Sequence, residues 1–259
     1  MLHLVIAIGL VALSGIARAQ ITLSHLGTYA TGQYDVAAAE IADFDPLNDR
    51  IWFSNAQNSI TGLNASNPAS LTLFTTIPMG VYGGGVNSVV VLSNGIAAAV
   101  EASPKTDPGK VVFFDLNGNY LNQVTVGALP DMLIATPDGS KLITANEGEP
   151  DNNYFIDPLG TVSIIDISGG LAAVTNANVT TLDFSAFTPA MLPGVRIFGP
   201  GASVAQDMEP EYVAVSGDSQ WAFVTCQENN AVAKINLVTN TITQVTALGY
   251  KDHSLAGNG

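Results

Sequence analysis

Basic residues are scarce in this sequence. Lys and Arg together number 8 of 259 residues, against 22 Asp and Glu, so the formal net charge is −14. A nucleic-acid-binding surface needs Lys and Arg to displace counterions from phosphates, and an anionic membrane attracts the same two residue types. We therefore expect no nucleic-acid partner and no attraction to an anionic membrane surface.

The usual catalytic and cofactor residues are also few. Cys226 is the single cysteine, so no intrachain disulfide can form, and the 3 histidines are too few for a His-rich zinc site. The sequence contains no P-loop, no dinucleotide fingerprint and no G-x-S-x-G motif. We expect neither a nucleotide nor a haem cofactor, and no standard nucleophile.

Only one apolar run stands out, at the N-terminus. Residues 4–13 are apolar and precede Ala17-Arg18-Ala19, an A-x-A-like cleavage site. The run is too short to span a bilayer, and no second long run follows it. The sequence predicts a signal peptide over residues 1–19 and no membrane span in the mature chain. The expected location is secreted, extracellular or cell-surface, with the periplasm as an alternative.

The rest of the chain contains a repeat. Four segments, beginning at Glu40, Asn87, Asp131 and Glu211, each read as short apolar strands joined by turns rich in Asp, Asn, Pro and Gly. The first two intervals, 47 and 44 residues, match a four-stranded propeller blade. The third interval is 80 residues, which indicates an insertion. An all-β sandwich is the alternative, but it would not explain the repeat.

The predicted fold is therefore an all-β, partial β-propeller over residues 39–259, with about four blades. We place a leader strand or linker at 20–38 and blades at about 39–80, 85–127, 129–208 and 209–249, with the insertion at 183–206. The chain stops in the turn-rich "YKDHSLAGNG". Because propellers close by pairing their ends, we expect the N-terminal part of a larger, about seven-bladed propeller.

Glycine marks the expected turns and linkers. Pro137-Asp138-Gly139, Asn94-Gly95 and Asn117-Gly118 are predicted to supply the positive φ angles of tight hairpins. "VYGGGVN" at residues 81–87 has no helix pattern after it, so it is interpreted as a flexible linker between blades.

Longer motifs add a family resemblance. "ATPDGSKLITANEGE…GTVSIIDIS" resembles surface-layer and YVTN-type propeller repeats of the WD40-like superfamily. "LPDMLIATPDGSKLITANEGEP" at 129–150, "EPEYVAVSGDSQWAFVTCQENNAVAKINL" at 209–237 and "GYKDHSLAGNG" at the end resemble the choice-of-anchor I family. That family includes relatives of mesenchyme-specific cell-surface glycoproteins. The resemblance implies a secreted or surface-anchored propeller and carries over no catalytic residue.

Aligning the blades brings acidic residues into register. Glu40, Asp131 and Glu211, with Asn87, fall at the start of the innermost strands, and Glu101, Glu147 and Glu228 follow the second strands. Equivalent positions in a propeller form rings around its axis. A ring of carboxylates repels itself unless it is neutralised, and oxygen ligands suit Ca²⁺ before Mg²⁺. The alternative is that these groups cap loops and bind water.

Two further segments are candidates. The loop "EGEPDNNYFIDP" is the densest acidic patch in the chain, and close to Glu147 it adds Glu149, Asp151, Asn152 and Asp157. Lys251, Asp252 and His253 could line a ligand-binding loop on the axial face, although a solvated turn is the simpler interpretation.

Two functions follow from this composition. The first is an exported binding or structural module that presents its axial face to an extracellular ligand or surface component. Ca²⁺ could be required for this binding. The second is a metal-dependent extracellular hydrolase, such as a phosphoesterase, with its site on the same face. Metal-assisted phosphate chemistry usually recruits positive groups, and these are few here, so the sequence favours the binding module.

Overall fold

The computed structural model describes residues 22–255, so the predicted signal peptide lies outside the described residues. Sixteen strands form four antiparallel sheets of four strands, each in sequential order. We call them the first (β1–β4), second (β5–β8), third (β9–β12) and fourth (β13–β16) sheets. The strands are β1 (Ala42–Asp45), β2 (Arg50–Asn55), β3 (Ser59–Asn64), β4 (Thr72–Pro78), β5 (Gly85–Leu92), β6 (Gly95–Glu101), β7 (Pro108–Phe114), β8 (Tyr120–Ala128), β9 (Pro130–Ala135), β10 (Lys141–Asn146), β11 (Thr161–Asp166), β12 (Val179–Asp183), β13 (Tyr212–Val215), β14 (Trp221–Cys226), β15 (Ala231–Asn236) and β16 (Thr241–Ala247).

Helix is almost absent from the described residues. Three 3₁₀ turns, η1 (Leu171–Ala173), η2 (Asn176–Asn178) and η3 (Pro189–Met191), accompany one short helix, α1 (Val204–Asp207). No helix within residues 22–255 is long and apolar enough to cross a membrane. The all-β prediction is therefore confirmed.

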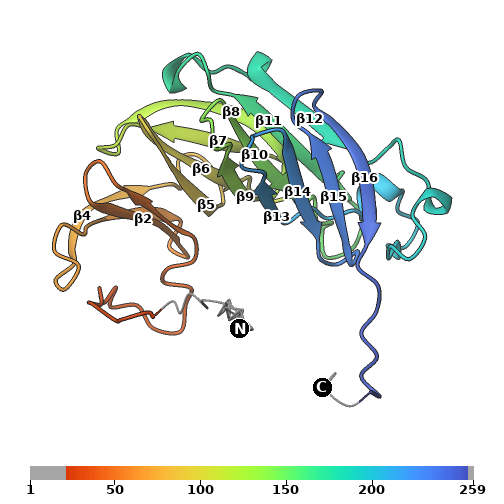
Figure 1. Cartoon of the computed structure of the whole chain (residues 1–259), viewed down its shortest axis with the longest axis horizontal. Coiled ribbons are helices and arrows are strands. Elements are labelled where there is room, and N and C mark those ends of the chain that lie inside the picture. The colour runs from red at the N-terminus through yellow and green to blue at the C-terminus, as the bar shows by residue number, and fades with distance from the viewer. Residues whose placement is uncertain (1–21, 256–259) are drawn as a thin grey trace, which may run out of the picture.

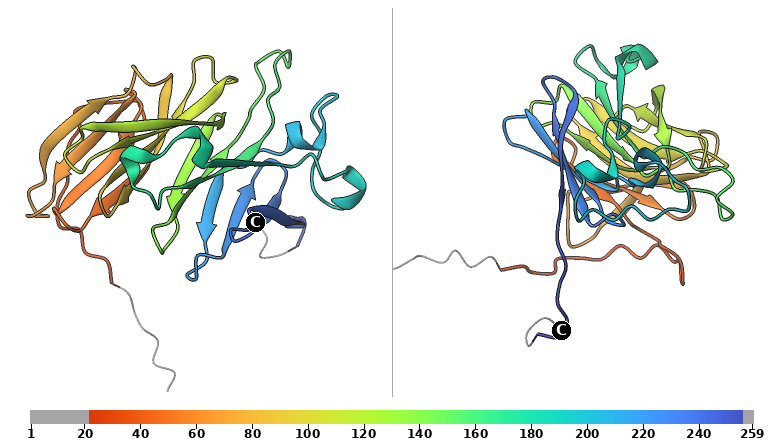
Figure 2. Two further views of the ribbon diagram at one scale, coloured as in Figure 1. Left: turned by 90° about the horizontal axis from the view of Figure 1, so that it is seen from above. Right: turned by 90° about the vertical axis from the view of Figure 1, so that its right-hand side faces the viewer.

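The four sheets follow one another in an open arc (Figures 1 and 2). The first strand of each sheet contacts the first strand of the next: β1 meets β5, β5 meets β9, and β9 meets β13. These four strands form the concave side of the arc, and the fourth strands form its outer rim (Figure 1). The arrangement explains why like positions in successive sheets become neighbours.

Apolar cores fill the spaces between sheets. Strand β6 shows how one strand serves two of them, because successive side chains on a strand point to opposite faces. Ile96, Ala98 and Val100 pack with Trp52 of the first sheet, whereas Ala97 and Ala99 join the core shared with the third sheet. A strand that is buried on both faces needs this continuous apolar run.

The third sheet carries two long connections. Residues 147–160 join β10 to β11, and residues 184–211 join β12 to β13. The second connection contains most of the predicted insertion, and its Phe184, Leu192 and Met208 are buried between the third and fourth sheets. The insertion therefore supplies part of the core rather than lying outside it.

An extended segment covers the free face of the first sheet. Residues 22–41 contain no strand, but Glu40 N–H donates to the Ser54 carbonyl at 3.1 Å, and the Ala37 carbonyl accepts from Ala56 N–H at 2.8 Å. Tyr29 and Thr31 line a small pocket together with Phe53 and other residues on the side turned away from the second sheet. The described part of the expected leader therefore contains no strand.

The turn predictions were right in two of three cases. Gly139 and Gly118 have φ of 69° and 86°. Asn94 and Gly95 do not have positive φ, so that prediction was wrong. Glycine is needed at Gly95 for a different reason: a Cβ there would lie 2.3 Å from the Phe114 carbonyl oxygen of the neighbouring strand.

Candidate functional site

The strand register places the acidic residues predicted to open the inner strands at one end of the sheets. Phe53, Ala98, Thr144 and Val224 on the second strands lie opposite Ala42, Val89, Leu133 and Val213 on the first strands. The candidate residues lie two positions before these four first-strand residues: they are Glu40, Asn87, Asp131 and Glu211. The four residues are therefore structurally equivalent, as the sequence alignment proposed.

The second group of acids aligns less completely. Glu101 and Glu147 lie three residues after Ala98 and Thr144, so these two are equivalent. The equivalent position in the fourth sheet is Gln227, and Glu228 is one residue further on. The sequence alignment therefore misplaced Glu228 by one residue, because the loop after β14 gives no sequence signal that fixes the register there.

Carboxylates from the third and fourth sheets are close enough to disturb one another's ionisation. We call Asp131, Glu147, Glu209, Glu211 and Glu228 the carboxylate cluster. The pKa of Glu147 is raised to about 7, first by burial and then by the charges of Asp131, Glu211 and Glu228, while Lys105 acts in the opposite direction. Each carboxylate in such a group disfavours the charged form of its neighbours.

Glu209 is the member that the sequence analysis missed. Its pKa is raised to about 7, first by burial and then by the charges of Glu228, Glu147, Asp207 and Glu211. Glu209 precedes Glu211 with the same E-x-E spacing that joins Glu147 to Glu149. That repeated spacing was the available signal.

Glu40 and Glu101 extend the cluster toward the first and second sheets. Burial raises the pKa of Asp131, and the charges of Glu40 and Glu101 contribute to the rise. The fourth equivalent residue, Asn87, uses its side-chain Nδ2 to donate to the Pro130 carbonyl at 3.1 Å. Asn87 therefore holds the second sheet to the start of β9, next to Asp131.

Glu211 combines burial with a fixed hydrogen bond. Burial raises its pKa, and the nearby charges of Asp131 and Glu228 act in the same direction. Its Oε1 accepts from Gln227 N–H at 3.2 Å, which favours the charged form and limits the rise.

Two predicted members have local partners instead. Glu149 forms an ion pair with Lys105 from the loop after β6. Asp151 caps its own loop: its Oδ1 accepts from Phe155 N–H at 2.8 Å and from Asn153 N–H at 3.3 Å. Asp151 is therefore fixed as a loop-capping residue.

Lys251, Asp252 and His253 are exposed and lie in the segment after β16, which runs away from the sheets (Figure 1). The Asp252 carboxylate accepts from Ser254 N–H at 2.9 Å. The structure does not place these three residues with the carboxylate cluster.

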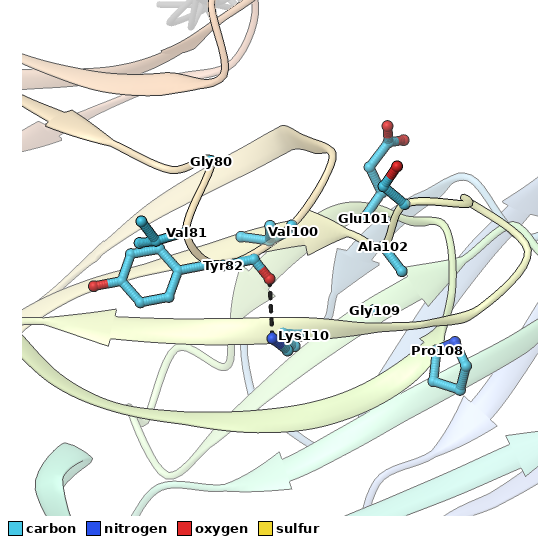
Figure 3. Close-up of a pocket in the computed structure, with 11 residues that line it drawn as sticks. Gly80, Val81, Tyr82, Val100, Glu101, Ala102, Pro108, Gly109 and Lys110 are labelled. Carbon is cyan, nitrogen blue, oxygen red and sulfur yellow. Dashed lines mark hydrogen bonds between the residues drawn. The ribbon is translucent and has the colours of Figure 1, made fainter.

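A pocket of about 320 Å³ lies beside Glu101 (Figure 3). It is formed by residues 80–83, the end of β6 and the start of β7. Lys110 Nζ donates to the Tyr82 carbonyl at 3.0 Å across it, and the Glu101 carboxylate points away from that lysine (Figure 3). The pocket is lined largely by backbone and small side chains.

The glycine run beside this pocket is not a flexible linker. Gly84 N–H donates to the Glu101 carbonyl at 2.8 Å, and Asn58 Nδ2 donates to the carbonyls of Gly83 and Gly84 at 3.0 and 3.1 Å. A Cβ on Gly83 would lie 2.1 Å from the Glu101 carbonyl oxygen. Glycine is required because two backbone segments meet here.

The metal geometry is not preformed. No three Asp, Glu, His or Cys side chains within residues 22–255 are grouped so that they could hold a metal ion as they stand. Glu and Asp side chains rotate readily, so the cluster offers oxygen ligands that an ion would have to draw together.

Comparison with known families fits this architecture. The model of the choice-of-anchor I domain matches residues 40–258. The chain belongs to the choice-of-anchor I family. The matched region of the choice-of-anchor I domain includes all four sheets and every residue of the carboxylate cluster. A choice-of-anchor I domain suggests a cell-surface-associated or extracellular module. A search of curated proteins found no match to this chain.

Proposed function

We propose that this protein is an exported β-propeller that acts at the cell surface or outside the cell as a Ca²⁺-dependent binding or structural module. The observation that carries the proposal is the carboxylate cluster, in which burial and the charges of neighbouring carboxylates raise the pKa of Glu147, Glu209 and Glu211. Membership of the choice-of-anchor I family supports the location.

The packing of the sheets supports the propeller. All four have the same strand order, and their first strands contact one another in sequence, as in propeller blades around an axis. Phe223 and Lys234 on the fourth sheet stand where Ile143 and Ile164 stand on the third. Those two isoleucines pack against the fourth sheet. We propose that further sheets stack in the same way in an about seven-bladed ring.

Calcium is the ion that best fits the cluster. Hard cations bind oxygen ligands, and Ca²⁺ accepts six to eight of them in flexible geometry. Asp131, Glu147, Glu209, Glu211 and Glu228 could supply them from one end of two sheets. Binding would replace mutual repulsion by attraction to a shared ion, so it would lower the pKa of Glu147 and Glu209.

Calorimetric titration of the protein with Ca²⁺ tests the proposal. We expect a saturable heat in the wild type and its loss in the double variant Glu147→Gln and Glu228→Gln. The control is Asp35→Asn, which removes a negative charge outside the carboxylate cluster, in the exposed segment before the first sheet. A wild type without a calcium heat, or one whose heat survives the double substitution, would contradict the proposal.

The alternative function, a metal-dependent hydrolase, makes a different prediction. It requires turnover of a phosphate ester that depends on added metal and on Glu147. If the protein is a binding module, phosphate-ester turnover with Ca²⁺, Mg²⁺ or Zn²⁺ present should not exceed the turnover in buffer without protein. Metal-dependent turnover lost in Glu147→Gln would replace the binding module by the enzyme.

A further inference from the structure

A small recess beside the carboxylate cluster combines acids with aromatic rings. It lies between the 147–160 connection and the 184–211 connection and has a volume of about 30 Å³. That is room for one water-sized group. Its lining includes two aromatic and four acidic side chains: Tyr154, Phe198, Asp157, Asp207, Glu209 and Glu228.

The walls of this recess are fixed by hydrogen bonds. Asp207 accepts from Phe198 N–H at 2.9 Å and also from Gly199 N–H. Gln206 Nε2 donates to the Asp157 carbonyl at 3.0 Å, so α1 holds the acidic loop in place. Tyr154 N–H donates to the Asp151 carbonyl at 2.9 Å and orders the loop tip. A preorganised wall loses little entropy when a ligand binds.

The recess has a net negative charge. Both Asp207 oxygens accept backbone N–H groups, which leaves Asp157, Glu209 and Glu228 to attract a ligand. Burial raises the pKa of Asp157, and the charge of Asp207 adds to the rise. Arg196 contacts one wall residue, because its guanidinium lies 4.8 Å from the ring centre of Phe198. A ring of this recess is therefore already in contact with a cation.

Apolar side chains continue outward from the recess. Phe155 is 87% exposed and Ile156 is 54% exposed, directly after Tyr154. Exposed apolar residues grouped beside a polar recess mark interaction surfaces. A ligand with a charged head in the recess could place a hydrocarbon chain against these two residues.

We propose that the recess binds a primary alkylammonium group. Its volume suits the compact –NH₃⁺ head, whereas a guanidinium or a tetraalkylammonium group is larger. Aromatic rings stabilise an organic cation but supply no ligand to Ca²⁺. This site goes beyond the calcium proposal, although Glu209 and Glu228 belong to both. The same head group occurs on lysine side chains and on free polyamines.

The first test uses pentylamine, in its charged form, titrated into the whole protein in the presence of a calcium chelator. We expect saturable binding by calorimetry or NMR, and weaker or no binding of pentylguanidinium and tetramethylammonium. Tyr154→Ala and Glu228→Gln should each weaken pentylammonium binding roughly five- to tenfold. Tyr34→Ala and Asp35→Asn, at exposed positions in residues 22–41, are the matched controls and should leave it unchanged.

The outcomes separate this proposal from the calcium proposal. Three results would contradict the proposal that the recess binds an alkylammonium group. They are the absence of saturable pentylammonium binding, equally tight binding of the larger cations, and equal weakening of binding by the control variants. Retention of the calcium heat by the same batch of protein, titrated with Ca²⁺ without the chelator, would show that only the recess proposal had failed.

A second arm identifies the source of the ammonium group. A lysine-rich peptide that binds more tightly than spermidine and loses affinity with Phe155→Ser would assign the recess to a polypeptide. Spermidine binding at least as tightly, with no effect of Phe155→Ser, would assign it to free polyamines. Binding of neither, despite binding of pentylammonium, would overturn both assignments and with them the biological use of the recess.

Discussion

The second and fourth sheets share one strand order but differ in what covers them. In the second sheet, β6 is buried from Gly95 to Val100, because sheets pack on both of its faces. In the fourth sheet, β14 and β15 alternate, and Phe223 is 41% exposed. The same repeat therefore gives either a continuous apolar run or an alternating strand, depending on the number of neighbouring sheets.

The free face of the fourth sheet is not simply hydrophilic. Lys234 lies over the ring of Trp221, with Nζ 4.0 Å from the ring centre. Its long side chain covers an aromatic surface while keeping the charge in water. In the third sheet Ile164 occupies the equivalent position, and it is buried against the fourth sheet.

The largest contrast should appear when one aromatic residue is removed from each sheet. Phe113→Ala in the second sheet creates a cavity in a fully buried core and should lower the free energy of unfolding by about 3–5 kcal/mol. Phe223→Ala in the fourth sheet should cost less than about 1 kcal/mol, because the ring is partly solvated already. Urea unfolding measures both. Equal losses would mean that the free face is covered in solution.

Lys234→Ile sharpens the comparison by making the fourth sheet resemble the third. We expect this variant to self-associate at concentrations where the wild type is less associated, because an apolar sheet face favours a partner. Sedimentation velocity measures the change, and Lys234→Arg is the control that retains the charge. Unchanged sedimentation of Lys234→Ile would show that the face does not act as an interface.

The acidic end of the third and fourth sheets should make stability depend on pH. The folded-state pKa of Glu147 is raised to about 7 from 4.5, so between these values the folded protein binds more protons than the unfolded chain. The free energy of unfolding should therefore fall as pH rises from 4.5 to 7. Glu147→Gln should flatten that slope, whereas Glu101→Gln, the equivalent change in the second sheet, should flatten it less.

The smallest effect is expected at the ion pair that joins the second and third sheets. Lys105→Met should change the free energy of unfolding by no more than about 1 kcal/mol, because both side chains of the Lys105–Glu149 pair are partly exposed. It should raise the pKa of Glu147 further, since Lys105 lowers that pKa. A pKa of Glu147 that stays unchanged in this variant would contradict the charge arrangement described here.

Much of this fold could be predicted from the repeat, because apolar strands and glycine-rich turns recur along the chain. Equivalent residues such as Asp131 and Glu211 followed directly from that repeat. The packing of the 184–211 connection could not be predicted, because Phe184 and Met208 follow no strand or helix period. The ion pair of Lys105 with Glu149 could not be predicted either, because it depends on the path of two loops. The need for glycine at Gly95 comes from the close approach of a neighbouring strand.

The most direct test of the account is a carbon-detected NMR titration of the glutamate carboxyl groups, with and without Ca²⁺. The account predicts that Glu147 titrates near pH 7 without Ca²⁺ and that its midpoint falls when the ion is added. A midpoint near 4.5 that Ca²⁺ leaves unmoved would mean that the acids of the sheets do not act on one another, and the proposed calcium site would have no basis.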